Sequence, residues 1–334
     1  MSKKFNTKRI NASRRTTLFA ALACAFSMAL PAQAQDAWPS KPIRLVLGFA
    51  AGGGTDVIAR GIAQKMGESL GTQVVVDNKP GANGNIANEL VAKSPADGYT
   101  LVYNTSSIVL SPALYPKLNY DVNRDMTPVA LTANLPIILV ASPKLPAKTA
   151  QELVAMLKAN PGKMNYASAG NGNITHLSAL LFLNSIGLTA THVPYRSEAP
   201  AITDVAGGQV DFYMSTAPGA IPLVKDKRVN ALAVSTLKRM DALPEVPTLS
   251  ESVSRGLELG AWSGIMAPAG TSPEIIAKLN VAIKAALTDK DLAAKFAVQG
   301  GEAKYMPAQQ YGAFLKSELA RWDTIVKKNN VKMD

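Results

Sequence analysis

Residues 43–70 decide the fold class, and they read IRLVLGFAAGGGTDVIARGIAQKMGESL. The apolar run over 43–49 predicts a buried strand. Apolar residues then recur every four positions from Ile58 to Leu70, which predicts a helix that Gly71 ends. Comparable strand and helix signals alternate along the chain. This alternation is typical of an α/β fold in which helices cover a mainly parallel sheet.

Two sets of strand and helix units divide the chain. A first set continues through strands expected over 74–76 and 100–103, and a second set begins at the apolar run between Pro136 and Pro143. The second set holds strands expected over 164–167, 191–193, 210–213 and 231–234. From Ser272 the signals are helical through Lys327, and this tail is expected to pack on the first sheet. We therefore expect a discontinuous first lobe (35–136 and 258–334), a second lobe (137–257) and a cleft between them.

The first 34 residues have the features of an export signal. They hold six basic residues and no acidic one, an uncharged run from Leu18 to Leu30, and the small-x-small pattern Ala32-Gln33-Ala34. We expect cleavage after Ala34 and a periplasmic location for the rest of the chain. Lipidation at Cys24, the only cysteine, is the alternative, and the export route is open between the general and the twin-arginine pathway.

The charge balance does not indicate nucleic-acid binding. The chain has 35 Lys and Arg against 24 Asp and Glu, a formal net charge of +11. Without the first 34 residues, 29 basic residues face 24 acidic ones, and no Lys/Arg run is left that could follow a phosphate backbone. The uncharged run is also shorter than the roughly 20 residues that a membrane-spanning helix needs.

A glycine-rich loop over 48–56 lies between the first expected strand and its helix. Free N–H groups at a helix start and the helix dipole together bind anions. The loop lacks the Lys-Ser/Thr pair of a P-loop, and Val57 stands where a dinucleotide fingerprint has its third glycine. The alternative is a plain turn capped by Thr55 or Asp56. We expect an anion site in which Asp56 orients the loop amides and does not touch the anion.

A second loop of the same design, 168–173, follows the strand expected over 164–167. Hydroxyl side chains at 105–107 and 215–216 follow two further strands. Open α/β sheets bind ligands beyond the carboxyl ends of their strands, so these groups are expected to face one cleft. Neutral donors in such a cleft suit a carboxylate, which accepts several hydrogen bonds at once.

Two chemical alternatives involve the histidines. Tyr166-Ala167-Ser168-Ala169-Gly170 approaches the Gly-x-Ser-x-Gly turn of α/β hydrolases, but Tyr166 stands where that turn needs glycine. His176 and His192 are the only histidines and could supply the base. No cluster of Cys or carboxylates accompanies them, so no metal site is expected.

Seven short motifs occur in order along the chain. They are WPSKPIR (38–44), AGG with Thr55-Asp56 (51–56), NKPGANGN (78–85), DGYTL (97–101), ASAGNG (167–172), HVPY (192–195) and APAGT (267–271). Together they resemble the Bordetella uptake gene (Bug) family, whose members are the extracytoplasmic solute-binding receptors of tripartite tricarboxylate transporters. The match covers essentially all of the chain after the export signal.

The resemblance implies a two-lobed, type II-like periplasmic binding protein whose cleft closes on a small carboxylate. It implies no enzymatic activity and no cofactor, and membrane transporter subunits as partners of a monomeric receptor. The contact residues that it implies are Phe49, Ala51, Gly52, Gly53, Asp56, Thr105, Ser106, Ser107, Ser168, Gly170, Asn171, Gly172, His176, Tyr195, Arg196 and Ser215. The alternatives are a periplasmic serine hydrolase using Ser168 and a ligand-sensing partner of a membrane sensor kinase.

This sequence departs from the family pattern in two places. Gly48 stands where many members have Pro, and Arg196-Ser197-Glu198 replaces a frequent Lys-Gly-Ser. We therefore expect the second-lobe side of the pocket to have its own preference. Arg196 is expected either to bind an anion or to form a surface ion pair with Glu198. Trp262 is expected in the core or hinge rather than in the cleft.

Overall fold

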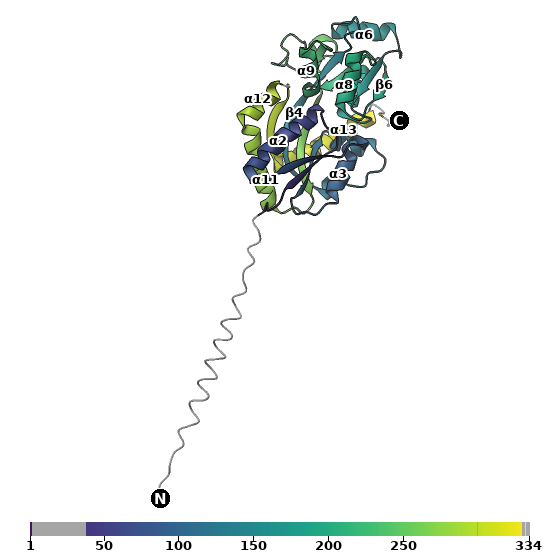
Figure 1. Ribbon diagram of the computed structural model, residues 1–334. Helices are drawn as coiled ribbons and strands as arrows, with labels where there is room; N and C mark the ends of the chain where they lie inside the picture. The colour runs from purple at the N-terminus through teal and green to yellow at the C-terminus, as the bar shows by residue number, and fades with distance from the viewer. Residues whose placement is uncertain (2–37, 299, 329–330, 332–334) are drawn as a thin grey trace. The chain divides into compact units, whose positions relative to one another are not determined.

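The computed structural model describes Met1 and residues 38–298, 300–328 and 331. The expected cleavage site after Ala34, and Cys24, lie outside the described residues. Figure 1 shows helices on both sides of a central sheet. The described strands form a ten-stranded sheet in the order β2-β1-β3-β9-β4-β7-β5-β6, and β8 and β10 also pair with β4.

Each parallel strand of the sheet is followed by a helix, as the alternating sequence signals predict. The strands are β1 (Ile43–Leu47), β2 (Val74–Asn78), β3 (Thr100–Thr105), β4 (Met126–Ala141), β5 (Asn165–Ser168), β6 (Thr191–Pro194), β7 (Phe212–Thr216), β8 (Asn230–Val234), β9 (Gly260–Pro268) and β10 (Glu302–Pro307). The helices are α2 (Gly54–Leu70), η1 (Ala82–Gly84), α3 (Asn85–Ala92), α4 (Ser107–Leu114), α5 (Val122–Asp125), α6 (Ala150–Ala159), α7 (Ile174–Ser185), α8 (Glu198–Gly207), α9 (Ala217–Lys225), α10 (Leu249–Ser252), α11 (Pro273–Thr288), α12 (Lys290–Val298) and α13 (Ala308–Lys328).

The long strand β4 joins the two halves of the sheet. Its residues up to Pro136 pair antiparallel with β9, whereas those from Ile137 onward pair with β7 and β8. We call β1–β3, β9, β10 and the first part of β4 the first lobe, and β5–β8 with the last part of β4 the second lobe. The change of partners at Pro136 supports the expected lobe division, whose exact limits remain a prediction.

The sheet is mixed, and the prediction of an α/β fold is confirmed. Parallel pairing holds within β2-β1-β3 in the first lobe and β6-β5-β7 in the second. The strands β4, β9 and β10 pair antiparallel. β4 and β9 are the strands in which the chain passes between the lobes, and they pair with each other antiparallel.

The expectation of an uninterrupted helical tail is wrong at β10, which separates α12 from α13 and pairs with β4. The exposed Glu302 and Lys304 alternate with the partly buried Ala303 and Tyr305. This alternation is the period of a half-buried edge strand, but it is too short to stand out between two helices. The tail does pack on the first lobe, as expected: α11 contacts α2 and β4, and α13 contacts α4 and β4.

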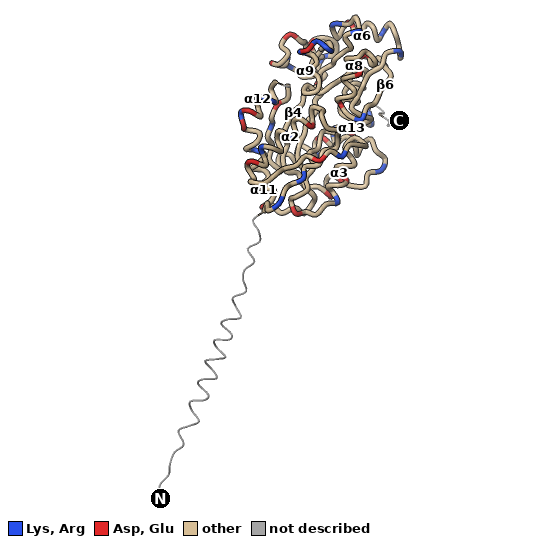
Figure 2. The backbone as a smooth tube through the Cα atoms, in the orientation of Figure 1, with Lys and Arg blue, Asp and Glu red and all other residues tan. Residues whose placement is uncertain are grey.

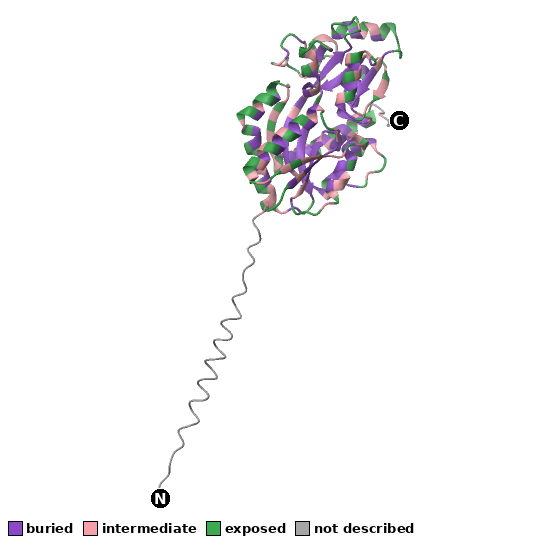
Figure 3. Cartoon of the chain, in the orientation of Figure 1, coloured by how far each residue is buried: buried purple, intermediate pink, exposed green. Residues whose placement is uncertain are grey.

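The core lies along the strands. Figure 3 shows the strands largely buried and the outward faces of the helices exposed. Figure 2 shows Lys and Arg interspersed with Asp and Glu over the described chain. Within residues 38–298 and 300–328, no helix is long and apolar enough to span a bilayer.

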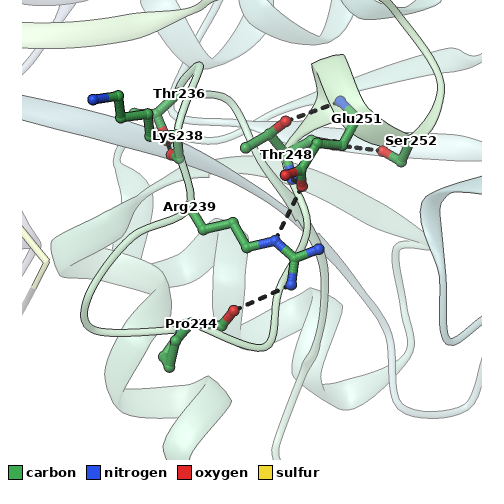
Figure 4. Close-up of polar contacts among 7 residues, drawn as sticks. All are labelled: Thr236, Lys238, Arg239, Pro244, Thr248, Glu251 and Ser252. Atoms are coloured by element: carbon green, nitrogen blue, oxygen red, sulfur yellow. Dashed lines mark hydrogen bonds and ion pairs between the residues drawn. The ribbon is translucent and has the colours of Figure 1, made fainter.

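The segment from β8 to β9 returns the chain to the first lobe, and polar contacts hold it in place (Figure 4). Arg239 Nε donates to Glu251 Oε2 at 3.1 Å, and Arg239 Nη1 donates to the Pro244 carbonyl at 3.3 Å. Glu251 also closes a capping box with Thr248 at the start of α10. The hydroxyl of Ser235, at the start of this segment, accepts from the Ile137 amide at 3.0 Å. The bonds of Arg239 and Glu251 hold the segment together, and the bond of Ser235 joins it to β4.

Candidate ligand-binding cleft

A cavity lies between the lobes, where the carboxyl ends of the parallel strands meet. Its free space is about 490 Å³, counting the part that opens to solvent. Residues from the N-terminal ends of α2, α7, α8 and α9 line it, as does Thr105 just before α4. Each helix has the positive end of its dipole and its unpaired amides at this end. No Lys, Arg or His of the described chain lines the cavity. The walls therefore attract anions mainly through the backbone.

The first-lobe wall is the glycine-rich loop that leads into α2. Gly53 is the N-cap residue, and Gly54 and Thr55 begin the helix, so their amides have no acceptor within it. Gly53 is only partly buried, and a Cβ built on it would meet nothing within 4 Å. All three residues line the cavity. An anionic ligand can accept hydrogen bonds there.

Asp56 holds this loop in shape, in agreement with its expected part in orienting the loop amides, and that it does not touch the anion stays a prediction. Its carboxylate accepts from the Gly52 amide at 3.0 Å, from Arg60 Nε at 2.9 Å and from Asn78 Nδ2 at 2.9 Å. Asn78 Nδ2 also donates to the Phe49 carbonyl at 2.9 Å. Burial alone would raise the pKa of Asp56, but these hydrogen bonds outweigh it and hold the pKa below its usual value.

The second-lobe wall includes the start of α7. Asn173 caps this helix by accepting from the Thr175 amide at 3.0 Å, and Thr175 Oγ1 accepts from the Ala169 amide at 2.9 Å. These bonds tie the loop after β5 to the first turn of the helix. Asn173 and Thr175 were not among the predicted contacts. Both residues follow the strand expected over 164–167, and this position beyond the end of a strand could have predicted that they line the cavity.

Glu198, the first residue of α8, is a second-lobe wall residue that sequence reasoning missed. It is 8% exposed, and Oε1 accepts from Ser215 Oγ at 2.9 Å and from the Thr216 amide at 2.8 Å. Burial raises the pKa of Glu198 despite these bonds. The alternative of a surface ion pair with Arg196 is wrong, because Glu198 is buried among hydroxyl groups while Arg196 is exposed.

The floor of the cavity is the pair of strands that joins the lobes, with Leu135 on β4 and Ala261 and Trp262 on β9. Trp262 is 4% exposed, and its Nε1 donates to Glu318 Oε2 on α13 at 3.3 Å. Trp262 is buried, as the expectation of a core or hinge position requires, and the expectation that it stays out of the cleft is wrong. Because β9 forms part of the cavity floor, Trp262 is buried and lines the cavity at the same time.

Hydrogen bonds cross the mouth of the cleft at Asn83. Asn83 Nδ2 donates to the Gly172 carbonyl of the second lobe at 2.8 Å. Its Oδ1 accepts from Ser107 Oγ of the first lobe at 2.9 Å and from Asn173 Nδ2 of the second at 3.1 Å. Asn83 has a positive φ of 56°, which Asn tolerates better than most residues. This bridge was not predicted.

The predicted contact residues fall into three groups. Those that line the cavity are Phe49, Gly53, Asp56 and Thr105. Those that line a second hollow at the mouth of the cleft are Phe49, Gly170, Asn171, Tyr195 and Arg196. Those that line neither are the exposed Ala51 and Gly52 and the buried Ser106, Ser107, Ser168, Gly172, His176 and Ser215.

The buried predicted residues support the walls from behind. Ser168 is fully buried, and a 2.6 Å hydrogen bond joins its Oγ to His192 Nε2. Its Oγ also accepts from the Gly170 amide at 3.1 Å. His176 stacks on His192 with ring centroids 3.9 Å apart and accepts from the Gly172 amide through Nδ1 at 3.1 Å. These contacts shape the loop after β5 and leave Ser168 no opening to the cavity.

His176 predicts a pH dependence of stability. Burial, and next the neighbouring His192, lower the pKa of His176 from 6.5 to about 3. Since the folded-state pKa is below the unfolded one, only the unfolded chain takes up this proton between these values. Stability therefore declines as the pH falls from about 6.5 towards 3, by at most about 1.4 kcal/mol per pH unit. In His176→Gln this part of the slope should disappear.

Urea unfolding at several pH values measures that slope. The difference between the two proteins at pH 8, where the imidazole is neutral in both states, gives the packing contribution of the replacement alone. Parallel pH dependences of wild type and His176→Gln down to pH 4 would contradict the role assigned to His176.

Comparison with known proteins identifies the family. Residues 58–331 match the family model of the Tripartite tricarboxylate transporter family receptor. The chain belongs to this family. One relative is protein BugT of Bordetella pertussis, which is 34% identical over 97% of this chain and 100% of its own length. A UPF0065 protein of Pseudomonas sp. strain P51 is 37% identical over 95% of this chain and 94% of its own.

Solved structures of similar sequence share the fold. The periplasmic binding protein BugD matches with a TM-score of 0.86 at 32% identity, over 89% of this chain and all of that one. Rpa4515 of R. palustris with adipate also has a TM-score of 0.86. It is 34% identical, over 88% of this chain and 99% of that one. MatC of Rhodopseudomonas palustris with bound malate has a TM-score of 0.82. It is 32% identical, over 86% of this chain and all of that one.

Family membership answers several of the sequence predictions. The resemblance to the Bug family and the two-lobed periplasmic binding protein fold are confirmed. The chain is a solute-binding receptor and not an enzyme, as predicted, so the hydrolase alternative at Ser168 does not apply. Membership also implies a periplasmic location.

Proposed function

We propose that this receptor captures a small organic carboxylate between its lobes and delivers it to the membrane subunits of a tripartite tricarboxylate transporter. One observation carries the proposal: the N-terminal ends of four helices line a single cavity whose walls have no cationic side chain within the described chain. Helix N-termini bind carboxylates through backbone N–H groups. Adipate and malate, the ligands named for two similar structures, are small carboxylates.

The first lobe holds one carboxylate group at the amides of Gly53, Gly54 and Thr55. The second lobe contributes the starts of α7, α8 and α9 from the opposite side. A ligand that touches both lobes favours the conformation in which they meet, so closure is a shift of population towards that conformation. The hydrogen bonds of Asn83 to Gly172 and Asn173 stabilise it.

The receptor acts in the periplasm as a monomer after cleavage behind Ala34. Lys and Arg are interspersed with Asp and Glu along the described chain (Figure 2). The conformation with the lobes together is the form that docks. The transporter subunits would then distinguish the ligand-bound receptor from the free one by the relative position of the lobes.

A melting screen of purified protein over mono-, di- and tricarboxylates and aromatic acids tests the ligand class. A ligand that binds only the folded state at 100 times its Kd adds about 2.7 kcal/mol of stability, which is several degrees in melting temperature. We expect one or a few carboxylates to give this shift and to be recovered chemically unchanged. A shift with uncharged analogues of equal size, and none with carboxylates, would contradict the proposal.

A further inference from the structure

Glu198 is a buried carboxylate in the cavity of a receptor for carboxylates. It is 8% exposed and lines the second-lobe wall. Among the described residues, no Lys, Arg or His forms an ion pair with it. Buried carboxylates in proteins are normally paired with a cation or fully hydrogen-bonded. The described part of the chain therefore supplies Glu198 with no cation.

The hydrogen bonds to Glu198 leave part of the acceptor capacity of its carboxylate unused. Ser215 Oγ and the Thr216 amide donate to Oε1 at 2.9 and 2.8 Å. Thr216 Oγ1 lies 2.9 Å from Oε1 and 2.8 Å from Oε2 but has one hydrogen to give. Glu198 thus receives at most three hydrogens from the described residues, whereas an ionised carboxylate accepts about four. The less occupied oxygen is Oε2.

The position of Glu198 relative to α2 determines which part of a ligand can reach its unused hydrogen-bond acceptor site. A Cβ built on Gly219 of α9 would overlap the Glu198 carboxylate. From the other side, a Cβ on Gly54 would come within 2.9 Å of Pro218 and 3.1 Å of the Gly219 amide. The start of α2 and the Glu198 carboxylate therefore flank the same turn of α9. Both also line the same cavity, so a ligand anchored on the α2 amides shares that space with Glu198.

We propose that Glu198 selects carboxylates whose second end is a hydrogen-bond donor and rejects those that place a second carboxylate there. The inference rests on the proposed function, because it assumes that one carboxylate sits at α2. A hydroxyl, amide or ammonium group fills the open acceptor site of Glu198. When Glu198 is ionised, a second carboxylate instead meets a like charge in a desolvated space without a compensating cation. This preference differs from adipate and malate, which both carry two carboxylates.

Two series of compounds of equal chain length test the selection. The first is succinate, 4-hydroxybutyrate and 4-aminobutyrate, and the second is adipate, 6-hydroxyhexanoate and 6-aminohexanoate. Each Kd is measured by titration calorimetry at pH 7.5 for wild type and Glu198→Gln. We expect wild type to bind a donor-ended member at least about tenfold more tightly than the matching dicarboxylate. The hydroxyl and ammonium arms show which kind of donor is preferred.

Glu198→Gln keeps the size and the acceptor oxygen but removes the charge. The ratio of Kd for the dicarboxylate to Kd for the donor-ended member should fall about tenfold in this variant. Glu245→Gln, the same change at an exposed residue, should leave the ratio unaltered, and Glu198→Ser provides a second neutral variant. Melting temperatures verify that each variant is folded.

Two failures are distinguishable. If wild type binds dicarboxylates as tightly as donor-ended members, or if the ratio is the same in Glu198→Gln, then the role of Glu198 is overturned while carboxylate capture stands. If neither protein binds any of the six compounds while another carboxylate of the melting screen binds, the inference is overturned and carboxylate capture stands. If no carboxylate of either set binds, the proposed function is overturned together with the inference.

Discussion

In Gly54→Leu the affinity for carboxylate should fall by about 100-fold while the protein remains folded. Gly54 begins α2, and a Cβ there would come within 2.9 Å of the Pro218 side chain and 3.1 Å of the Gly219 amide in the second lobe. Backbone atoms of α9 cannot give way as a flexible side chain would. Overpacking such a contact costs about 1–3 kcal/mol, and 100-fold in Kd is about 2.7 kcal/mol.

Titration calorimetry measures the affinity, and the melting temperature without ligand measures the fold. The cost falls on the conformation in which the lobes meet, so the ligand-free variant can separate its lobes and should melt within a few degrees of wild type. Gly207→Leu is the matched control, because Gly207 is exposed and a Cβ there meets nothing within 4 Å. Wild-type affinity in Gly54→Leu would exclude contact between α2 and α9 in the ligand complex.

Removal of the Asn83 side chain should weaken binding by about tenfold to 100-fold, mainly through faster dissociation. Asn83 makes two hydrogen bonds across the cleft, to the Gly172 carbonyl and from Asn173. Each is worth about 0.5–1.5 kcal/mol. Asn83→Gly is the suitable replacement because the backbone there has a positive φ, which glycine adopts without strain.

Stopped-flow tryptophan fluorescence measures the dissociation rate, with Trp262 in the cavity floor as the reporter. Asn119→Gly is the control, since the amide of Asn119 donates to Glu89 within the first lobe and not across the cleft. An unchanged dissociation rate in Asn83→Gly would mean that the hydrogen bonds of Asn83 do not hold the lobes together around a ligand.

The sequence alone predicts the frame of the site because that frame follows from local periodicity. The run of apolar residues in β1, the four-residue spacing in α2 and the glycine at 71 are local signals, and Gly71 indeed ends the helix with a φ of 67°. The rule that ligands bind beyond the carboxyl ends of parallel strands then places the cavity. Gly53 and Thr105 could be predicted on that basis.

Side-chain directions could not be predicted in the same way. Glu198 looked like a surface residue because Glu is seldom buried, and only the neighbouring hydroxyls of Ser215 and Thr216 make its burial tolerable. Both residues end β7, whereas Glu198 begins α8. Ser168 ends β5 and His176 lies in the first turn of α7, on either side of the predicted loop. Ser168 bonds to His192, and His176 accepts from the Gly172 amide, so neither side chain lines the cavity. Such pairings depend on tertiary contacts that no local pattern encodes.

The crystal structure of the receptor with the carboxylate that gives the largest melting shift tests the central claim most directly. That claim is that backbone amides at the start of α2 hold the anion in the cavity between the lobes. The account predicts carboxylate oxygens within about 3 Å of the amide nitrogens of Gly53, Gly54 or Thr55, with the second lobe in contact with the same molecule. A ligand bound away from these amides, or held by one lobe alone, would contradict it.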